Sequence, residues 1–180
     1  VTSGGSGFGV MAIVTGIHRN FISRADGLAR VQKIVNFLKT ADRFHGAYSH
    51  WIDGNTGKAI AFSAKDNGGD LVETSLLMAG LLTARQYFDG ATTAEINLKN
   101  DITTLYNQVE WSWYRNGTNT LLWHWSPDFN WDINLKIQGW NECLITYILA
   151  ASSPTYTIPK TVYDEGWAKN GSIKNGNTYY

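Results

Sequence analysis

Acidic side chains gather at the start of one apolar segment of this 180-residue chain. Asp66, Asp70 and Glu73 fall within a few residues of one another, on either side of the pair Gly68-Gly69. On a helix, residues three apart such as Asp70 and Glu73 share a face, with their Cβ atoms about 5–6 Å apart. The same spacing is typical of a helix cap, in which Asp accepts hydrogen bonds from backbone N–H groups and Glu faces the positive end of the helix dipole. The acids therefore fit either a structural cap or a site for acid–base chemistry.

A fourth carboxylate, Glu142, follows Trp140-Asn141 at the start of another apolar segment. Asn141 could cap a helix there, and Glu142 could stabilise its dipole. Acids surrounded by aromatic rings are also what glycoside hydrolysis needs, because one carboxyl group protonates the leaving oxygen and a second activates water or attacks. Burial among tryptophans is expected to raise the pKa of such an acid towards neutrality.

Most of the eight tryptophans lie outside the apolar stripes of the predicted helices. Aromatic side chains in loops can simply pack, but so many outside the stripes favours some stacking on the apolar C–H faces of sugar rings. The candidates for substrate binding are the three tryptophans and three polar residues that lie near the acids: Asp66, Trp140, Asn141, Trp51, His124 and Trp125.

The elements that must position these residues are mainly helices. Apolar residues recur with helical spacing over residues 8–20, 24–38, 70–88, 93–109 and 139–152. Ser23 is the predicted N-cap of the second of these helices, and Thr92 or Thr93 is the predicted N-cap of the fourth. Residues 2–7, by contrast, have the composition of a flexible linker.

Two aromatic hairpins are predicted between the helices. Residues 53–57 have the composition of a turn and separate two short strands within residues 48–62. Residues 115–119 have a similar composition within residues 111–125.

The predicted elements recur at an offset of 69 residues. Ser23 is followed at this offset by Thr92, and Glu73 by Glu142. Each unit is an outer helix, an aromatic segment, and an inner helix with an acid in its first turn. The pattern indicates stacked helical pairs, which bury their faces against neighbouring pairs. We therefore expect an all-α fold with aromatic β-hairpin insertions, in which residues 1–180 form one piece of a larger helical toroid.

Composition excludes several classes of protein. Fifteen basic and fifteen acidic residues give a net charge of zero, so the chain has no electrostatic footprint for nucleic acid or an acidic membrane surface. The longest apolar run, residues 76–82, is far shorter than the ~20 residues that span a bilayer. The single cysteine, Cys143, excludes an internal disulfide. A neutral polymer, carbohydrate above all, is the expected partner.

Long motifs in this chain resemble the glucoamylase-like domain of bacterial β-1,2-glucanases, glycoside hydrolase family 144. The motifs are DNGGDLVETS at residues 66–75, GLLTARQYF at 80–88, LWHWSP at 122–127, GWNECLITY at 139–147 and YDEGWA at 163–168. The resemblance implies an (α/α)6 toroid, of which this chain would form a little under half. It also implies an inverting endo-hydrolase of β-1,2-glucan that needs no metal or other cofactor.

The resemblance further implies that Asp66, Asp70, Glu73 and Glu142 lie in the active-site pocket. Glu142 is the best candidate for the general acid, while the base is less clear and could lie outside this chain. The alternatives are a non-catalytic glycan-binding or scaffold domain, or a glucoamylase-like hydrolase of another glucan linkage. The expected partner is a glucan oligosaccharide or polysaccharide, without nucleic acid or membrane insertion. A periplasmic or secreted location is expected, with any signal peptide outside this chain.

Overall fold

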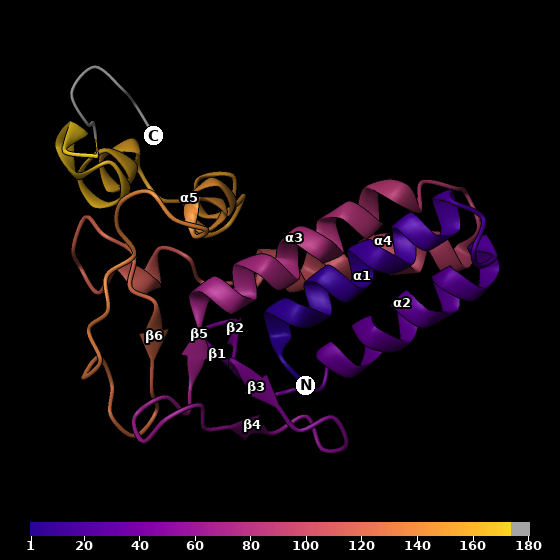
Figure 1. Ribbon diagram of the computed structural model, residues 1–180, viewed down its shortest axis with the longest axis horizontal. Helices are drawn as coiled ribbons and strands as arrows, with labels where there is room; N and C mark the ends of the chain where they lie inside the picture. Colours follow the sequence, from indigo (N-terminus) through magenta and orange to yellow (C-terminus); the bar gives the residue numbers. More distant parts are fainter. Residues whose placement is uncertain (174–180) are drawn as a thin grey trace.

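The computed structural model describes residues 1–173 as a mostly helical protein, which confirms the predicted helical class (Figure 1). Within these residues the helices are α1 (Ser3–His18), α2 (Arg24–Leu38), α3 (Leu71–Tyr87), α4 (Thr93–Asn107) and α5 (Leu144–Ala151). Single turns follow at η1 (Trp113–Arg115), η2 (Val162–Trp167) and η3 (Lys169–Gly171). No helix in this part of the chain is both long enough and apolar enough to cross a membrane.

The helices form two layers. α1 and α3 pack along their length, and α5 packs against α3. α2 returns beside α1, α4 returns beside α3, and α2 and α4 contact each other. The chain therefore stacks two helical pairs and begins a third, with α1, α3 and α5 in one layer.

The glycine-rich start of the chain is helical, so the predicted linker over residues 2–7 is wrong. Thr2 caps α1 by accepting a hydrogen bond from the N–H of Gly5 at 3.1 Å. A Cβ atom on Gly7 would overlap the backbone of α3 at Leu76, and one on Gly80 of α3 would overlap the backbone of Gly7. The glycines are needed because they let the backbones of the two helices approach closely.

Helix starts lie where their capping residues predict them. Ser23 Oγ accepts the N–H of Asp26 at 3.0 Å at the start of α2. Thr92 Oγ1 accepts the N–H of Glu95 at 3.3 Å at the start of α4. Both predicted caps are confirmed.

The strands lie near the start of α3 (Figure 1). β1 (Arg43–Phe44) pairs with β2 (Ala47–Tyr48), and β3 (Trp51–Ile52) pairs with β4 (Ala59–Ile60). All three pairs, including the one described next, are antiparallel. The β3–β4 pair lies within residues 48–62, so the first predicted hairpin is confirmed.

The second predicted hairpin is wrong. β6 (His124–Trp125) pairs with β5 (Gly69–Asp70), with His124 opposite Asp70, and residues 113–115 form a single helical turn. The N–H of Leu122 still donates to the carbonyl oxygen of Tyr114, but residues 121 and 123 bond elsewhere, since Ile137 N–H donates to Leu121 and Trp123 N–H donates to Leu135. The long-range pairing has a functional consequence, because it brings His124 to the acid-rich start of α3.

Candidate active site

Asp70 is the most buried of the candidate acids, with 1 % of its surface exposed. Its Oδ1 accepts hydrogen bonds from the N–H groups of Val72 at 3.0 Å and Glu73 at 2.9 Å, which confirms it as the N-cap of α3. Its Oδ2 lies 3.2 Å from Nδ1 of His50. Asp70 therefore fixes both the helix start and the His50 ring.

Glu73 joins the helices α1 and α3. Its Oε2 accepts the N–H of Gly4 in the first turn of α1 at 2.9 Å. In a full capping box this carboxylate would instead reach back to the backbone of Asp70. The acid therefore ties the starts of α1 and α3 together, so that both helices begin on the same side of the molecule.

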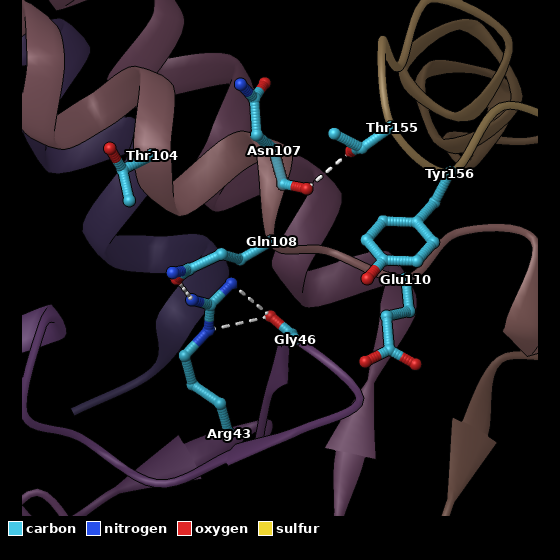
Figure 2. Close-up of a pocket in the computed structure, with 8 residues that line it drawn as sticks. All are labelled: Arg43, Gly46, Thr104, Asn107, Gln108, Glu110, Thr155 and Tyr156. Atoms are coloured by element: carbon cyan, nitrogen blue, oxygen red, sulfur yellow. Dashed lines mark hydrogen bonds between the residues drawn. The ribbon is translucent and has the colours of Figure 1, made fainter.

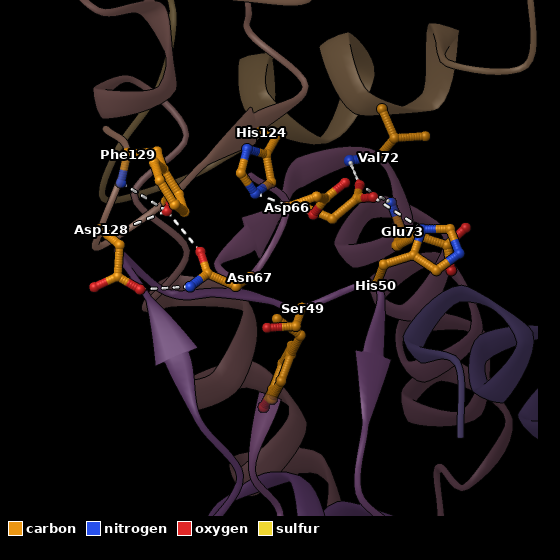
Figure 3. Close-up of polar contacts among 12 residues, drawn as sticks. Ser49, His50, Asp66, Asn67, Val72, Glu73, His124, Asp128 and Phe129 are labelled. Atoms are coloured by element: carbon orange, nitrogen blue, oxygen red, sulfur yellow. Dashed lines mark hydrogen bonds and ion pairs between the residues drawn. The ribbon is translucent and has the colours of Figure 1, made fainter. Parts of the chain in front are cut away.

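Asp66 lies beside a deeply buried histidine. Its Oδ1 is 3.0 Å from Nε2 of His124, whose surface is 2 % exposed (Figure 3). The contact lies within ion-pair distance but lacks hydrogen-bond geometry, and neither ring nitrogen of His124 bonds to a protein atom of the described chain. Within residues 1–173, no three His, Cys, Asp or Glu side chains are arranged to hold a metal ion.

Glu142 lies in a turn before α5, because the helix begins at Leu144 and not within residues 139–142 as predicted. Gly139 has a left-handed φ of 76°, which breaks helical geometry at this point. Asn141 Oδ1 accepts the N–H of Cys143 at 2.9 Å, so Asn141 caps this turn. Glu142 is exposed, and the burial predicted for it is not found in this part of the protein.

The Cys143 thiol shows that the two acid clusters are close. Burial, together with the negative charges of Glu142 and Asp70, raises the pKa of Cys143 to about 12. Both carboxylates act on the same buried group, and α5 packs against α3, so the turn before α5 lies near α3.

Exposed aromatic rings flank the acids. Trp51 is 42 % exposed and Phe62 is 50 % exposed, with ring centroids 5.6 Å apart. His50 lies against Phe62 with a centroid distance of 4.1 Å. Trp140, next to Asn141, is 64 % exposed. Trp125 is half-buried beside His45 and Trp113, so of the three predicted tryptophans Trp51 and Trp140 offer the freer faces.

Sequence reasoning missed His50 as a partner of Asp70. The pair is 20 residues apart, and it forms because residues 47–52 pass alongside the start of α3. The position of His50 immediately before the exposed Trp51 was the available signal, but it does not identify a partner.

The His50–Asp70 pair makes stability depend on pH. The hydrogen bond to Asp70 raises the pKa of His50 above its usual 6.5, burial opposes the rise, and the charges of Glu73 and Asp66 add to it. A raised folded-state pKa gives stability that is complete below the unfolded pKa and lost as pH rises through the folded value. We expect the free energy of unfolding of the parent to exceed that of His50→Gln by most at pH 5.5, and the gap to shrink towards pH 8. Denaturant titrations across this range test it, and a gap independent of pH would contradict it.

A separate cavity lies away from the candidate acids (Figure 2). Its volume is about 700 Å³, and its lining residues are Arg43, Gly46, Thr104, Asn107, Gln108, Glu110, Thr155 and Tyr156. Arg43 donates to the carbonyl oxygen of Gly46 at 2.9 and 2.7 Å and to Oε1 of Gln108 at 2.6 Å. The guanidinium of Arg43 is already hydrogen-bonded, and none of the candidate acids lines this cavity, so the candidate site remains the acid-rich region at the starts of α3 and α5.

The stacked helical pairs, with acids and exposed indoles at the helix starts, are similar to a known class of carbohydrate-active domain. Residues 134–180 match the family model described as "Putative glucoamylase". The predicted resemblance is confirmed.

Particular relatives cover the whole chain. An endo-β-1,2-glucanase from Chitinophaga pinensis, solved in complex with sophorotriose and glucose, is 59 % identical with a TM-score of 0.96 over 100 % of this chain and 43 % of its own. A β-1,2-glucanase structure from Parabacteroides distasonis is 50 % identical with a TM-score of 0.93, over 100 % of this chain and 29 % of its own.

A further relative is named for a different specificity. The exo β-1,2-glucooligosaccharide sophorohydrolase (non-reducing end) of Parabacteroides distasonis is 50 % identical over 100 % of this chain and 28 % of its own length. The chain therefore spans less than half the length of each of these relatives.

Proposed function

We propose that this chain is part of an inverting β-glucan hydrolase whose substrate is β-1,2-glucan, cleaved internally. The observation that carries the proposal is the packing of α5 against α3, which brings the carboxylates before both helices to one region beside exposed indoles. Its support is the similarity of the whole chain to proteins named β-1,2-glucanases.

We assign Glu142 as the general acid that protonates the leaving glycosidic oxygen. It is exposed and caps no helix, so its carboxyl group can reach a bound saccharide. In an inverting enzyme a second carboxylate, about 6.5–9.5 Å away, activates a water on the opposite face of the sugar. Asp66 caps no helix, and it or a carboxylate outside this chain supplies that base.

Asp70 and Glu73 are assigned to positioning. Both accept hydrogen bonds from backbone N–H groups at the starts of α1 and α3, so one oxygen of each carboxylate is already hydrogen-bonded within the protein. Through these bonds the two carboxylates fix the positions of the helix starts. The helix starts in turn determine where the saccharide and the attacking water bind. Asp66, Trp140, Asn141, Trp51, His124 and Trp125 complete the proposed saccharide site.

We propose that the complete catalytic domain is an (α/α)6 toroid and that residues 1–180 are one piece of it. The row α1, α3, α5 exposes apolar side chains at both ends, Phe8 on α1 and Ile148 on α5. Helical repeats bury such faces against further pairs. We also propose a periplasmic or secreted location, because a glucan polymer is met outside the cytoplasm.

Product analysis of the intact protein on α- and β-glucans of defined linkage tests the function. We expect β-1,2-glucan to be cleaved to oligosaccharides of many lengths, with the α-anomer formed first, as inversion at a β-linkage requires. Release of sophorose alone would replace the endo action by the exo action named for the sophorohydrolase. Binding without new reducing ends would favour the non-catalytic glycan-binding alternative, and cleavage of another linkage would correct the substrate.

A further inference from the structure

Three aromatic rings form a column. His45 stacks on Trp113 with centroids 3.4 Å apart and planes 10° apart, and Trp113 faces Trp131 at 4.7 Å and 35°. We call His45, Trp113 and Trp131 the aromatic column. Nδ1 of His45 lies 2.9 Å from Oε2 of Glu110, which holds the inner end of the column.

The outer end of the column is supported from the side. The ring of Tyr114 meets Trp131 edge-on at 5.9 Å, and Tyr114 is itself buried. Trp125 meets Trp113 edge-on at 5.3 Å. Aromatic pairs in edge-on and offset geometry are stabilising beyond their buried area, so the half-buried Trp131 is held in one orientation.

A cavity of about 330 Å³ opens at this end of the column. Its lining residues are Ser112, Trp113, Asn116, Gly117 and Trp131. None of them carries a charge, and the side chains of Ser112 and Asn116 form no hydrogen bond to another residue within 1–173. Indole surface beside a free hydroxyl and a free amide fits a sugar ring, which has apolar C–H faces and a hydroxyl rim, better than it fits an ion.

The cavity is joined to the acid cluster by the loop that carries Trp131. Ser126 Oγ donates to Oδ1 of Asn67 at 2.6 Å, and Nδ2 of Asn67 lies 2.5 Å from Oδ2 of Asp128. Lys65 Nζ pairs with Oδ2 of Asp132 at 3.0 Å. The loop on both sides of Trp131 is thus tied to the residues on both sides of Asp66.

We propose that Trp131, with the cavity beside it, is a binding subsite for a glucosyl unit of the polymer remote from the cleaved bond. The inference rests on the proposed function, since a polymer held at the acids is what would extend along this loop. The site carries no carboxylate in its lining, so it contributes affinity for long chains and no chemistry. Short oligosaccharides that occupy only the acid cluster do not reach it.

Trp131→Ala in the intact protein tests the subsite. We expect KM on long β-1,2-glucan to rise about three- to tenfold, as loss of one aromatic stacking contact implies. We expect kcat to stay nearly unchanged, because this contact is made equally in the ground state and the transition state. KM for the shortest β-1,2-oligosaccharides that are cleaved should not change, and Trp131→Phe should be intermediate.

Phe129→Ala is the matched control, since Phe129 lies in the same loop but does not line the cavity. It should leave both KM values unchanged. A lower melting temperature of Trp131→Ala with an unchanged KM on polymer, or an equal rise of KM on short and long chains, would overturn the subsite. If the parent cleaves no glucan, the proposed function fails, and affinity electrophoresis with β-1,2-glucan still decides the inference. Weaker retardation of Trp131→Ala would support it, and equal retardation would overturn it.

Discussion

Glu142→Gln is expected to lower kcat on glucan polymer by about 10²–10⁴-fold, which is the usual effect of losing a general acid. The fold should be retained, because Glu142 is exposed and it is Asn141 that accepts the N–H of Cys143. A glycosyl fluoride should be partly spared, since its leaving group needs little protonation. Rates on both substrates, together with the melting temperature, measure the effect.

Glu95→Gln is the matched control for this substitution. Glu95 is also an acid at a helix start, but it lies in the first turn of α4, where its Oε1 is 2.6 Å from Nη2 of Arg24. We expect this variant to melt lower and to keep its kcat. If Glu142→Gln instead kept its activity and melted several degrees lower, Glu142 would be a structural residue and the assignment of the acid would be wrong.

Local signals predicted the helix starts well. Ser23, Asp70 and Thr92 each accept N–H groups within three residues, so their roles depend on short stretches of sequence. The start of α1 was missed because its glycines are needed for close contact with α3, which lies some 70 residues further along the chain. Local composition cannot distinguish a flexible glycine from one that allows two backbones to touch.

In the candidate site, too, local features could be predicted from the sequence and long-range contacts could not. The positions of the acids followed from their spacing before apolar segments, but their partners did not. Gly4 is 69 residues from Glu73, and His124 pairs with the strand before α3 instead of with its own neighbours. The start of α5 was misplaced because a left-handed Gly139 interrupts a segment whose apolar pattern alone reads as helical.

Asp70 is expected to give the largest stability effect among the candidate acids. Asp70→Ala removes both hydrogen bonds to the start of α3 and leaves the partly buried His50 without its partner. Loss of a cap costs about 0.5–2 kcal/mol, and an unsatisfied buried polar group costs about 1–3 kcal/mol. We therefore expect the free energy of unfolding to fall by about 2–4 kcal/mol, measured by denaturant titration of the intact protein.

Asp70→Asn separates the cap from the charge. Asn caps a helix as well as Asp does, so the free energy of unfolding should fall by less than about 1 kcal/mol. The negative charge that contacts His50 is lost, and the pH dependence of stability should shrink to the smaller part that the charges of Glu73 and Asp66 sustain. If Asp70 also positions the reacting groups, kcat should fall about 10²-fold, the cost of a small misplacement in an active site.

Asp26→Asn serves as the control, because Asp26 lies at the exposed start of the outer helix α2. It should change neither kcat nor the pH dependence of stability. If Asp70→Asn were as active as the parent while Asp70→Ala was destabilised as expected, Asp70 would act through the backbone of α3 alone. The charge that the site requires would then have to come from Glu142, from Asp66 or from a carboxylate outside this chain.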